Sequence, residues 1–116
     1  GSTRVIVLTD ESSVARGSQA EFRHFGVCLV IRTDVIRALA ELVRDPDAVI
    51  VVSATLPGCD LEDVIDLALA TDPTAVLLGV STGADAATVA RVSAAGARAT
   101  VQLPLTPEGL AADLRA

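Results

Sequence analysis

Short apolar runs recur five times along the chain, and each is rich in Val, Ile and Leu. Within a run the apolar residues are continuous, a pattern typical of strands that are buried on both faces. Strands of this kind form parallel sheets covered by helices. The runs span residues 5–8, 27–31, 48–52, 75–80 and 99–103.

Segments with helical spacing separate the runs. After the second run, apolar residues recur three and four positions apart, with Thr33 or Asp34 able to cap the helix and Pro46 able to end it. After the third run, Asp60 can cap a helix that ends near Asp72. The residues predicted to face the core are Val35, Ile36, Leu39, Leu42 and Val43 in the first of these helices, and Val64, Ile65, Leu67 and Ala68 in the second.

Three further helices are predicted from their ends. One covers about residues 84–95, and Gly96 fits the left-handed position that ends many helices. The last begins at Thr106-Pro107-Glu108, where a capping hydroxyl precedes a proline in the first helical position. The helix nearest the N-terminus is predicted over Ser13 to about His24. The inner faces are assigned to Val14, Ala20, Phe22 and Phe25 in that helix, and to Leu110 and Leu114 in the last one.

Five strands that alternate with five helices predict a doubly wound (βα)₅ sheet of the α/β class, because parallel strands need crossover connections and these are right-handed. In such sheets, ligands bind at the carboxyl ends of the strands. The candidate site therefore consists of the residues that follow the strands, namely Thr9-Asp10-Glu11, Ser53-Ala54, Ser81-Thr82 and Leu103-Pro104.

Length and hydropathy limit the class of protein. A chain of 116 residues is expected to form a single domain, residues 1–116, with Gly1-Ser2 left over from an expression tag. Although 51% of the residues are hydrophobic, no apolar stretch reaches the roughly 18 residues that a membrane span needs. We find no secretion signal and expect a soluble, cytoplasmic domain without membrane contact.

Charge and cysteine content exclude further classes. The net charge is −6 and the nine arginines are scattered singly, so we expect no direct contact with nucleic acid. Cys28 and Cys59 are too few for a disulfide framework and lack metal-ligand spacing, so both are expected to be free thiols, with Cys28 buried. The chain contains no lysine, and therefore no side-chain ammonium group.

The strand ends resemble those of one family. The stretch Ser53-Ala54-Thr55-Leu56-Pro57-Gly58-Cys59-Asp60 is similar to the Asp-Leu-x-Met-Pro-Gly-x-Asp stretch of CheY-like receiver domains of bacterial response regulators. Ala95-Gly96-Ala97 and Leu103-Pro104 have the spacing of that family's Ala-Gly-Ala and Lys-Pro, and Gly26 falls where its first helix commonly ends. The resemblance covers the whole chain and implies the flavodoxin/CheY-like strand order 2-1-3-4-5.

Receivers of this family accept a phosphoryl group on an aspartate after strand 3, beside a divalent cation. The resemblance places Ser53 at the acceptor position, and Thr9 and Asp10 at the acidic positions after strand 1 that hold the cation. It places Ser81 at a hydroxyl position and Leu103 at the position of a lysine that pairs with the phosphoryl oxygens. Thr100 takes the place of a strand-5 aromatic residue, and Pro104 that of a proline that commonly follows a cis peptide.

These replacements disfavour phosphoryl transfer. An acyl phosphate needs a carboxylate, and Ser53 has no neighbouring base, since His24 is expected at the far end of the first helix. Only Asp10, with Glu11 beside it, remains to hold Mg²⁺, so we expect no resident metal or cofactor. Leu103 carries no charge, and no arginine is expected near the carboxyl end of a strand to compensate the phosphoryl group.

Other interpretations of the same residues remain open. Asp10 and Glu11 are either the remnant of a metal site or polar residues that cap the first helix. Ser53 and Ser81 either bind a small ligand or bond the backbone in the vacated pocket. Asp60 is expected to cap the third helix rather than to accept phosphate. The face that receivers use for dimers carries Arg91, Arg98 and Asp113, of which Arg98 and Asp113 form a cross-subunit pair or stay solvated.

The leading hypothesis is a phosphorylation-independent receiver that forms homodimers and controls an attached DNA-binding output domain, hence transcription. The alternative is a sensor domain in which a small-molecule effector binds between Asp10, Ser53 and Ser81. An enzyme is not expected, because no glycine-rich phosphate loop follows strand 1 and no nucleophile and base lie at a plausible separation.

Overall fold

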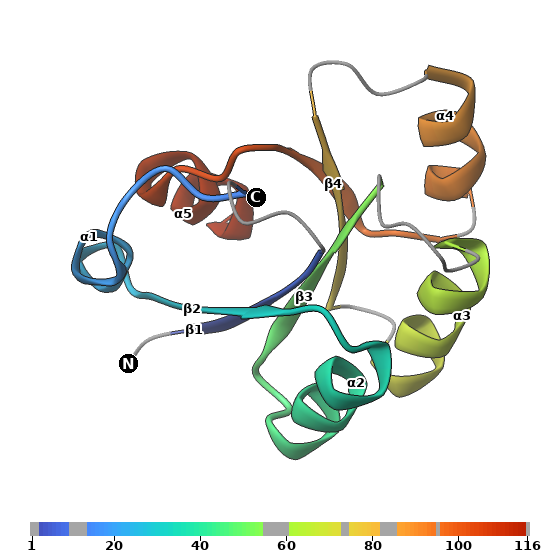
Figure 1. Ribbon diagram of the computed structural model, residues 1–116, viewed down its shortest axis with the longest axis horizontal. Helices are drawn as coiled ribbons and strands as arrows, with labels where there is room; N and C mark the ends of the chain where they lie inside the picture. The colour runs from blue at the N-terminus through green and yellow to red at the C-terminus, as the bar shows by residue number, and fades with distance from the viewer. Residues whose placement is uncertain are drawn as a thin grey trace.

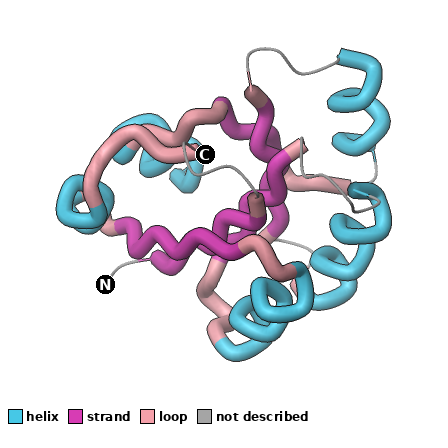
Figure 2. The backbone as a smooth tube through the Cα atoms, viewed as in Figure 1, coloured by secondary structure: helices cyan, strands magenta, loops and turns pink. Residues whose placement is uncertain are grey.

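A computed structural model describes residues 3–9, 14–54, 61–72, 75–81, 86–94 and 96–115. Within these residues, five parallel strands form one sheet in the order β2-β1-β3-β4-β5 (Figure 2). The strand order and the parallel pairing are as predicted. The strands are β1 (Thr3–Leu8), β2 (Val27–Arg32), β3 (Val49–Ser53), β4 (Val76–Val80) and β5 (Ala99–Gln102).

Helices cover both faces of the sheet, which confirms the doubly wound α/β architecture. α1 and α5 lie on one face, and α2, α3 and α4 lie on the other (Figure 1). The helices are α1 (Gln19–His24), α2 (Val35–Arg44), α3 (Leu61–Thr71), α4 (Ala86–Ala94) and α5 (Pro107–Arg115).

Two hydrophobic cores result from the alternation of side chains along the central strands. In β1, Ile6 and Leu8 pack under α2 and α3, whereas Val5 and Val7 pack under α1 and α5. Because both faces are covered, the central strands β1, β3 and β4 need apolar residues at consecutive positions. Burial on both faces therefore explains the continuous apolar runs in the sequence.

The edge strands β2 and β5 are less buried than their sequences predict. Cys28 is a half-buried free thiol rather than a buried one, and Ile31 is exposed. In β5, Val101 is buried while Ala99 and Thr100 are exposed. An edge strand has a neighbour on one side only, so the helices shield it less completely.

The prediction for the first helix was wrong at its start. α1 begins at Gln19 rather than near Ser13. Ser18 forms a capping box with Glu21: the Glu21 N–H donates to Ser18 Oγ and the Ser18 N–H donates to Glu21 Oε1, both at 3.2 Å. Phe22 faces the core as predicted. Val14 is buried but precedes the helix, and Ala20 and Phe25 are exposed, so their assignment to its inner face was also wrong.

The other described helix ends agree with the sequence. Asp34 caps α2, which ends before Pro46, and Thr106 caps α5, where its Oγ1 accepts from the Gly109 N–H at 3.1 Å. Leu110 is buried and Leu114 packs partly buried against the same core, as predicted. Gly96, just after α4, has a φ of 125°, as its predicted role requires.

The predicted inner faces of α2 and α3 are wider than the faces that the fold buries. Val35 and Leu39 of α2 pack against the core, as predicted. In α2, Ala38 and Leu42 are buried, whereas Ile36 and Val43 are exposed. In α3, Val64, Ile65 and Ala68 are buried as predicted, but Leu67 is exposed. A helix buries a stripe roughly 100° wide, and α2 and α3 carry more apolar residues than one stripe can hold. Within the described residues, no helix is long and apolar enough to cross a membrane.

Candidate functional site

The positions implied for phosphate chemistry lie at the carboxyl edge of the sheet, as expected. Thr9 follows β1 and its backbone N–H donates to the Arg32 carbonyl at 2.9 Å. Ser53 ends β3 and is paired in register with Gly79 of β4. Thr9 and Ser53 each expose 0% of their surface. A hydroxyl that is fully buried is closed to a phosphodonor in solution.

Leu103 fills the position at which the resemblance implies a lysine. Its backbone N–H donates to the Val80 carbonyl at 2.8 Å, so it continues the register of β5 beside β4. Its side chain is 4% exposed and belongs to the core under α1 and α5. It lies over Gly79, where an added Cβ would be 3.2 Å from Leu103 Cδ1. The Leu103-Pro104 peptide bond is cis.

The described residues do not suit a divalent cation at this edge. Mg²⁺ and Ca²⁺ are held mainly by carboxylate oxygens, whereas Thr9 and Ser53 offer hydroxyls. Asp10, Glu11, Asp60 and Thr82 lie outside the described residues. The described part of the chain holds no group of three or more His, Cys, Asp or Glu side chains able to bind a metal ion.

Arg16 lies at this edge, contrary to the expectation that no arginine would. The segment before α1 is extended rather than helical: the Arg16 N–H donates to the Leu105 carbonyl at 2.7 Å, and the Leu105 N–H donates to the Val14 carbonyl at 2.6 Å. Ala15 and Leu105 thereby form a parallel bridge. This pairing holds Arg16 beside the residues that follow β5.

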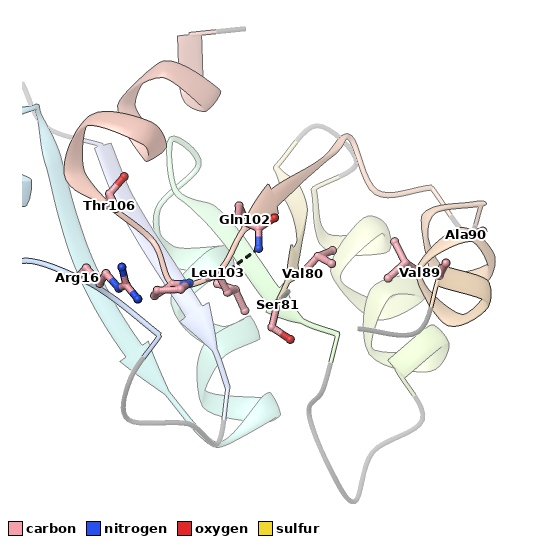
Figure 3. A pocket seen from close by; sticks show the side chains of 10 residues that line it. Arg16, Val80, Ser81, Val89, Ala90, Gln102, Leu103 and Thr106 are labelled. Carbon is pink, nitrogen blue, oxygen red and sulfur yellow. Dashed lines mark hydrogen bonds between the residues drawn. The ribbon is translucent and has the colours of Figure 1, made fainter. Parts of the chain in front are cut away.

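A cavity of about 780 Å³ opens beside Leu103. Figure 3 shows it extending from Arg16, past Leu103 and Ser81, to Val89 and Ala90 of α4. The Gln102 side-chain amide donates to the Leu103 carbonyl at 3.1 Å at its rim. The full lining is Arg16, Val80, Ser81, Ala86, Val89, Ala90, Gln102, Leu103, Pro104 and Thr106. The walls are thus mainly aliphatic, with one guanidinium and a few neutral polar groups.

Solved structures match the chain along nearly its whole length. Vibrio cholerae chemotaxis protein CheY4 superposes with a TM-score of 0.76 at 18% identity, covering 99% of this chain and 98% of that one. A CheY-like receiver domain protein from Methanospirillum hungatei JF-1 gives a TM-score of 0.76 at 16% identity, covering 99% and 92%. Full-length FixJ from B. japonicum gives 0.73 at 18% identity, covering 95% and 54%. The chain has the receiver fold.

No protein-family model matches the sequence, and no curated protein matches it either. The likeness is therefore one of receiver fold, with little sequence in common.

Within the receiver fold, the four expected site residues that the structure describes do not share one open pocket. Thr9 and Ser53 are buried in the sheet, while Ser81 and Leu103 line the cavity on the α4 side. Asp10 and Glu11 are outside the described residues.

The expected dimer face of the receiver fold carries exposed polar groups. Arg98 and Asp113 are exposed, as is Thr100 on β5, and the side chain of Arg91 lies outside the described residues. A role for these residues in dimers stays a prediction. His24, at the end of α1, is exposed and packs edge-on against Phe25, with ring centroids 5.3 Å apart.

Arg16 was not among the residues that the sequence predicted for this region. The signal was present in the Ser-x-x-Glu pattern of Ser18 and Glu21, which favours a helix start at Ser18. A start there leaves residues 14–16 extended, and this geometry brings Arg16 to the receiver fold's carboxyl edge.

Proposed function

We propose that this chain is an atypical receiver domain, which regulates without phosphorylation of Ser53. The observation that carries the proposal is the complete burial of Ser53, at the position where receivers carry the acceptor aspartate. Burial excludes the phosphodonor, and the hydroxyl lacks the carboxylate that forms an acyl phosphate. These two features act independently, so restoring one does not restore transfer.

The surroundings of Ser53 support the same proposal. An incoming phosphoryl group brings about two negative charges that need a cation or a fixed positive group. The neighbouring Leu103 is apolar and packed into the core. Arg16 lines the cavity, which Ser53 does not. His24 ends α1 two residues before Gly26, whose carbonyl accepts from the Thr3 N–H at the amino edge of the sheet. We infer that this domain performs no phosphotransfer or other enzymatic step.

The output of the domain follows from the resemblance. We infer a cytoplasmic response regulator in which this domain controls an attached DNA-binding domain and hence transcription. Full-length FixJ, of which this chain covers 54%, is an example of a longer chain that contains this fold. With a net charge of −6, the domain itself is not expected to touch nucleic acid. The exposed residues Arg98 and Asp113, with Arg91, are the family-based candidates for a homodimer contact.

Treatment with acetyl phosphate and Mg²⁺ tests the first proposal. Intact-mass spectrometry should show no adduct, whereas a receiver with aspartate at the end of β3, treated in parallel, should gain about 80 Da, the mass of one phosphoryl group. The variant Ser53→Ala is a matched control for labelling at that position. Stoichiometric phosphorylation of the unmodified chain would defeat the proposal, and loss of the label in Ser53→Ala would assign it to Ser53.

A second candidate function is effector sensing, which the cavity between Arg16 and α4 favours. Its volume of about 780 Å³ lies in the range of small-molecule sites. The cavity differs from the effector site predicted from the sequence, because Ser53 is buried away from it while Ser81 lines it, and Asp10 lies outside the described residues. Aliphatic walls with the Arg16 guanidinium at one end suit an organic anion with an apolar body.

A thermal-shift screen with amphipathic carboxylates tests this second function. Binding to the folded state raises the Tm with ligand concentration. A ligand of this cavity should lose affinity about tenfold in Arg16→Gln, consistent with one charge-assisted hydrogen bond. Arg23→Gln on the exposed side of α1 is the matched control. Equal affinity in both variants would remove the cavity from the explanation.

A further inference from the structure

The exposed sides of α2 and α3 carry large apolar side chains that the fold leaves uncovered. Ile36 is 74% exposed, Val43 is 66% exposed and Leu67 is 53% exposed. Ile36 and Val43 are seven residues apart and therefore lie on one side of α2. Exposed large apolar residues that gather on adjacent elements are typical of contact surfaces.

Charges on the same sides of the two helices have opposite signs. The exposed side of α2 carries Arg37 and Arg44, and that of α3 carries Asp63 and Asp66. Within the described part of the chain, the ion pairs are Arg4 with Asp45 and Arg32 with Glu41, so none of these four charges is paired. One helix is therefore a basic apolar surface, and its neighbour is an acidic apolar surface.

The two helices lie side by side on one face of the sheet (Figure 1). Each follows the carboxyl end of a strand and precedes the amino end of the next, so both run in the same direction. They pack over one core that contains Ala38, Leu42 and Ile65. Together their outer sides form a single face, which we name the α2/α3 face and define by Ile36, Arg37, Ala40, Val43 and Arg44 of α2 and Asp63, Asp66, Leu67 and Ala70 of α3.

We propose that the α2/α3 face binds a second copy of this chain. A two-fold axis that runs parallel to the helices, between α2 and α3, places α2 of one copy over α3 of the other, and the same contact then occurs twice. Basic and acidic surfaces meet in both halves of such a dimer. No other arrangement of the two helices about a two-fold axis achieves this, because an axis across the helices places α2 against α2 and α3 against α3.

The positions along the helices agree with this arrangement. Arg37 and Asp63 are each the third residue of their helix, and the proposed dimer pairs them. The same pairing places Leu67, the seventh residue of α3, between Ile36 and Val43, the second and ninth residues of the opposing α2. Ala40 and Ala70 are small and exposed, which permits the helices to approach closely.

The size of the face predicts a weak dimer. Two helices of 10 and 11 residues, with a rise of about 1.5 Å per residue and a spacing of about 10 Å, present a surface of about 300 Å² in projection. Stable complexes bury about 800 Å² per partner. We therefore expect reversible association with a Kd on the order of 100 µM.

This dimer is independent of the proposed function, since it rests on no property of Ser53 or of the cavity. It also differs from the family-based contact through Arg98, just before β5, and Asp113 of α5. Phosphorylation assays test the proposed function, and the association state tests the α2/α3 face. Failure of one proposal thus leaves the other intact.

Charge reversal in sedimentation velocity tests the proposal. The chain should associate between about 10 µM and about 1 mM, and Arg37→Asp or Asp63→Arg alone should weaken the dimer at least tenfold, because each places two like charges opposite each other. The double variant with both changes should recover it. Arg23→Asp, on the exposed side of α1 and on the opposite face of the sheet, is the matched control and should leave the association unchanged, and circular dichroism should show that every variant is folded.

Four outcomes of this experiment would overturn the proposal. These outcomes are a monomer at all concentrations, a dimer that neither single reversal weakens, a double variant that does not recover, and a dimer that Arg23→Asp disrupts. Recovery in the double variant is the sharpest readout, because a general effect of surface charge on association would not reverse when both charges are exchanged.

Discussion

The side chain of Leu103 covers the backbone of Gly79, which is paired in register with Ser53 on the next strand. A Cβ added at Gly79 would lie 3.2 Å from Leu103 Cδ1 and 3.1 Å from Val51 Cγ1. These distances are shorter than ordinary carbon contacts of about 3.5–4.0 Å. The close approach explains the glycine: it gives Leu103 room to pack into the core at the end of β4.

Gly79→Ala should therefore be destabilising by about 1 kcal/mol, although alanine is generally better than glycine in a strand. Leu103→Ala removes two of the three closest contacts to the new methyl group. In that background the same glycine substitution should be neutral or stabilising. Urea denaturation of the four proteins of this cycle measures the coupling, and additive effects would show that Leu103 does not determine the cost.

Ser53→Asp should destabilise the fold because the new carboxylate replaces a residue that exposes 0% of its surface. Ser53→Asn adds nearly the same volume without charge and is the matched control. At neutral pH the aspartate variant should be less stable than the asparagine variant by about 2 kcal/mol.

The sign of the pH dependence follows from burial. Burial raises the pKa of the new carboxyl in the folded state, so the folded state binds more protons than the unfolded one and the stability falls as pH rises. The difference between the two variants should therefore shrink as the pH is lowered to about 4. Thermal unfolding between neutral and acid pH measures it. A constant difference would mean that the charge is not responsible.

The sequence predicted the fold because several independent patterns indicate it. The runs at β1, β3 and β4 are continuous, since two layers of helices cover them, and the helix ends at Asp34, Thr106 and Gly96 carry local signals. Helix faces were harder to assign. In α2 both Leu42 and Val43 are apolar, and only Leu42, four residues after the buried Ala38 and on the same side of the helix, faces the core. Composition alone does not express that choice.

The sequence predicted where the candidate site lies, but it did not predict how far solvent reaches its residues. The order of the strands brings Thr9 and Ser53 to the carboxyl edge, which follows from topology. Their burial depends on what packs over them, a property of the folded chain. Arg16 lies at this edge because α1 begins only at Gln19, with Ser18 as its cap, so residues 14–16 precede the helix.

Ser18→Ala should lower the stability by about 1 kcal/mol, because it removes the side-chain acceptor for the Glu21 N–H. Ser18→Asp keeps an acceptor at the same position and should stay close to the unmodified protein. Since α1 follows the extended segment that holds Arg16, weaker capping should also increase amide hydrogen exchange at residues 14–21. Equal stability of the alanine and aspartate variants would show that the capping box contributes little.

Arg32 and Glu41 join the end of β2 to α2 through a partly buried ion pair, in which Arg32 Nε donates to Glu41 Oε1 at 2.8 Å. The other carboxylate oxygen, Oε2, is buried without a hydrogen-bond partner. Arg32→Met should destabilise the protein by about 2 kcal/mol, because the Glu41 carboxylate, 14% exposed, is left without its cation. Arg32 is itself 35% exposed, so solvent screening keeps the effect below that of a fully buried pair.

Replacing both partners should cost less than replacing Arg32 alone. In Arg32→Met/Glu41→Met no charge remains buried, and the methionines can pack against α2. Chemical denaturation at neutral pH distinguishes the variants, with Arg4→Met, which removes the exposed pair with Asp45 at 3.7 Å, as the control that should change the stability little. If the double variant is as unstable as Arg32→Met, then lost packing of the arginine side chain, and not the stranded carboxylate, sets the cost.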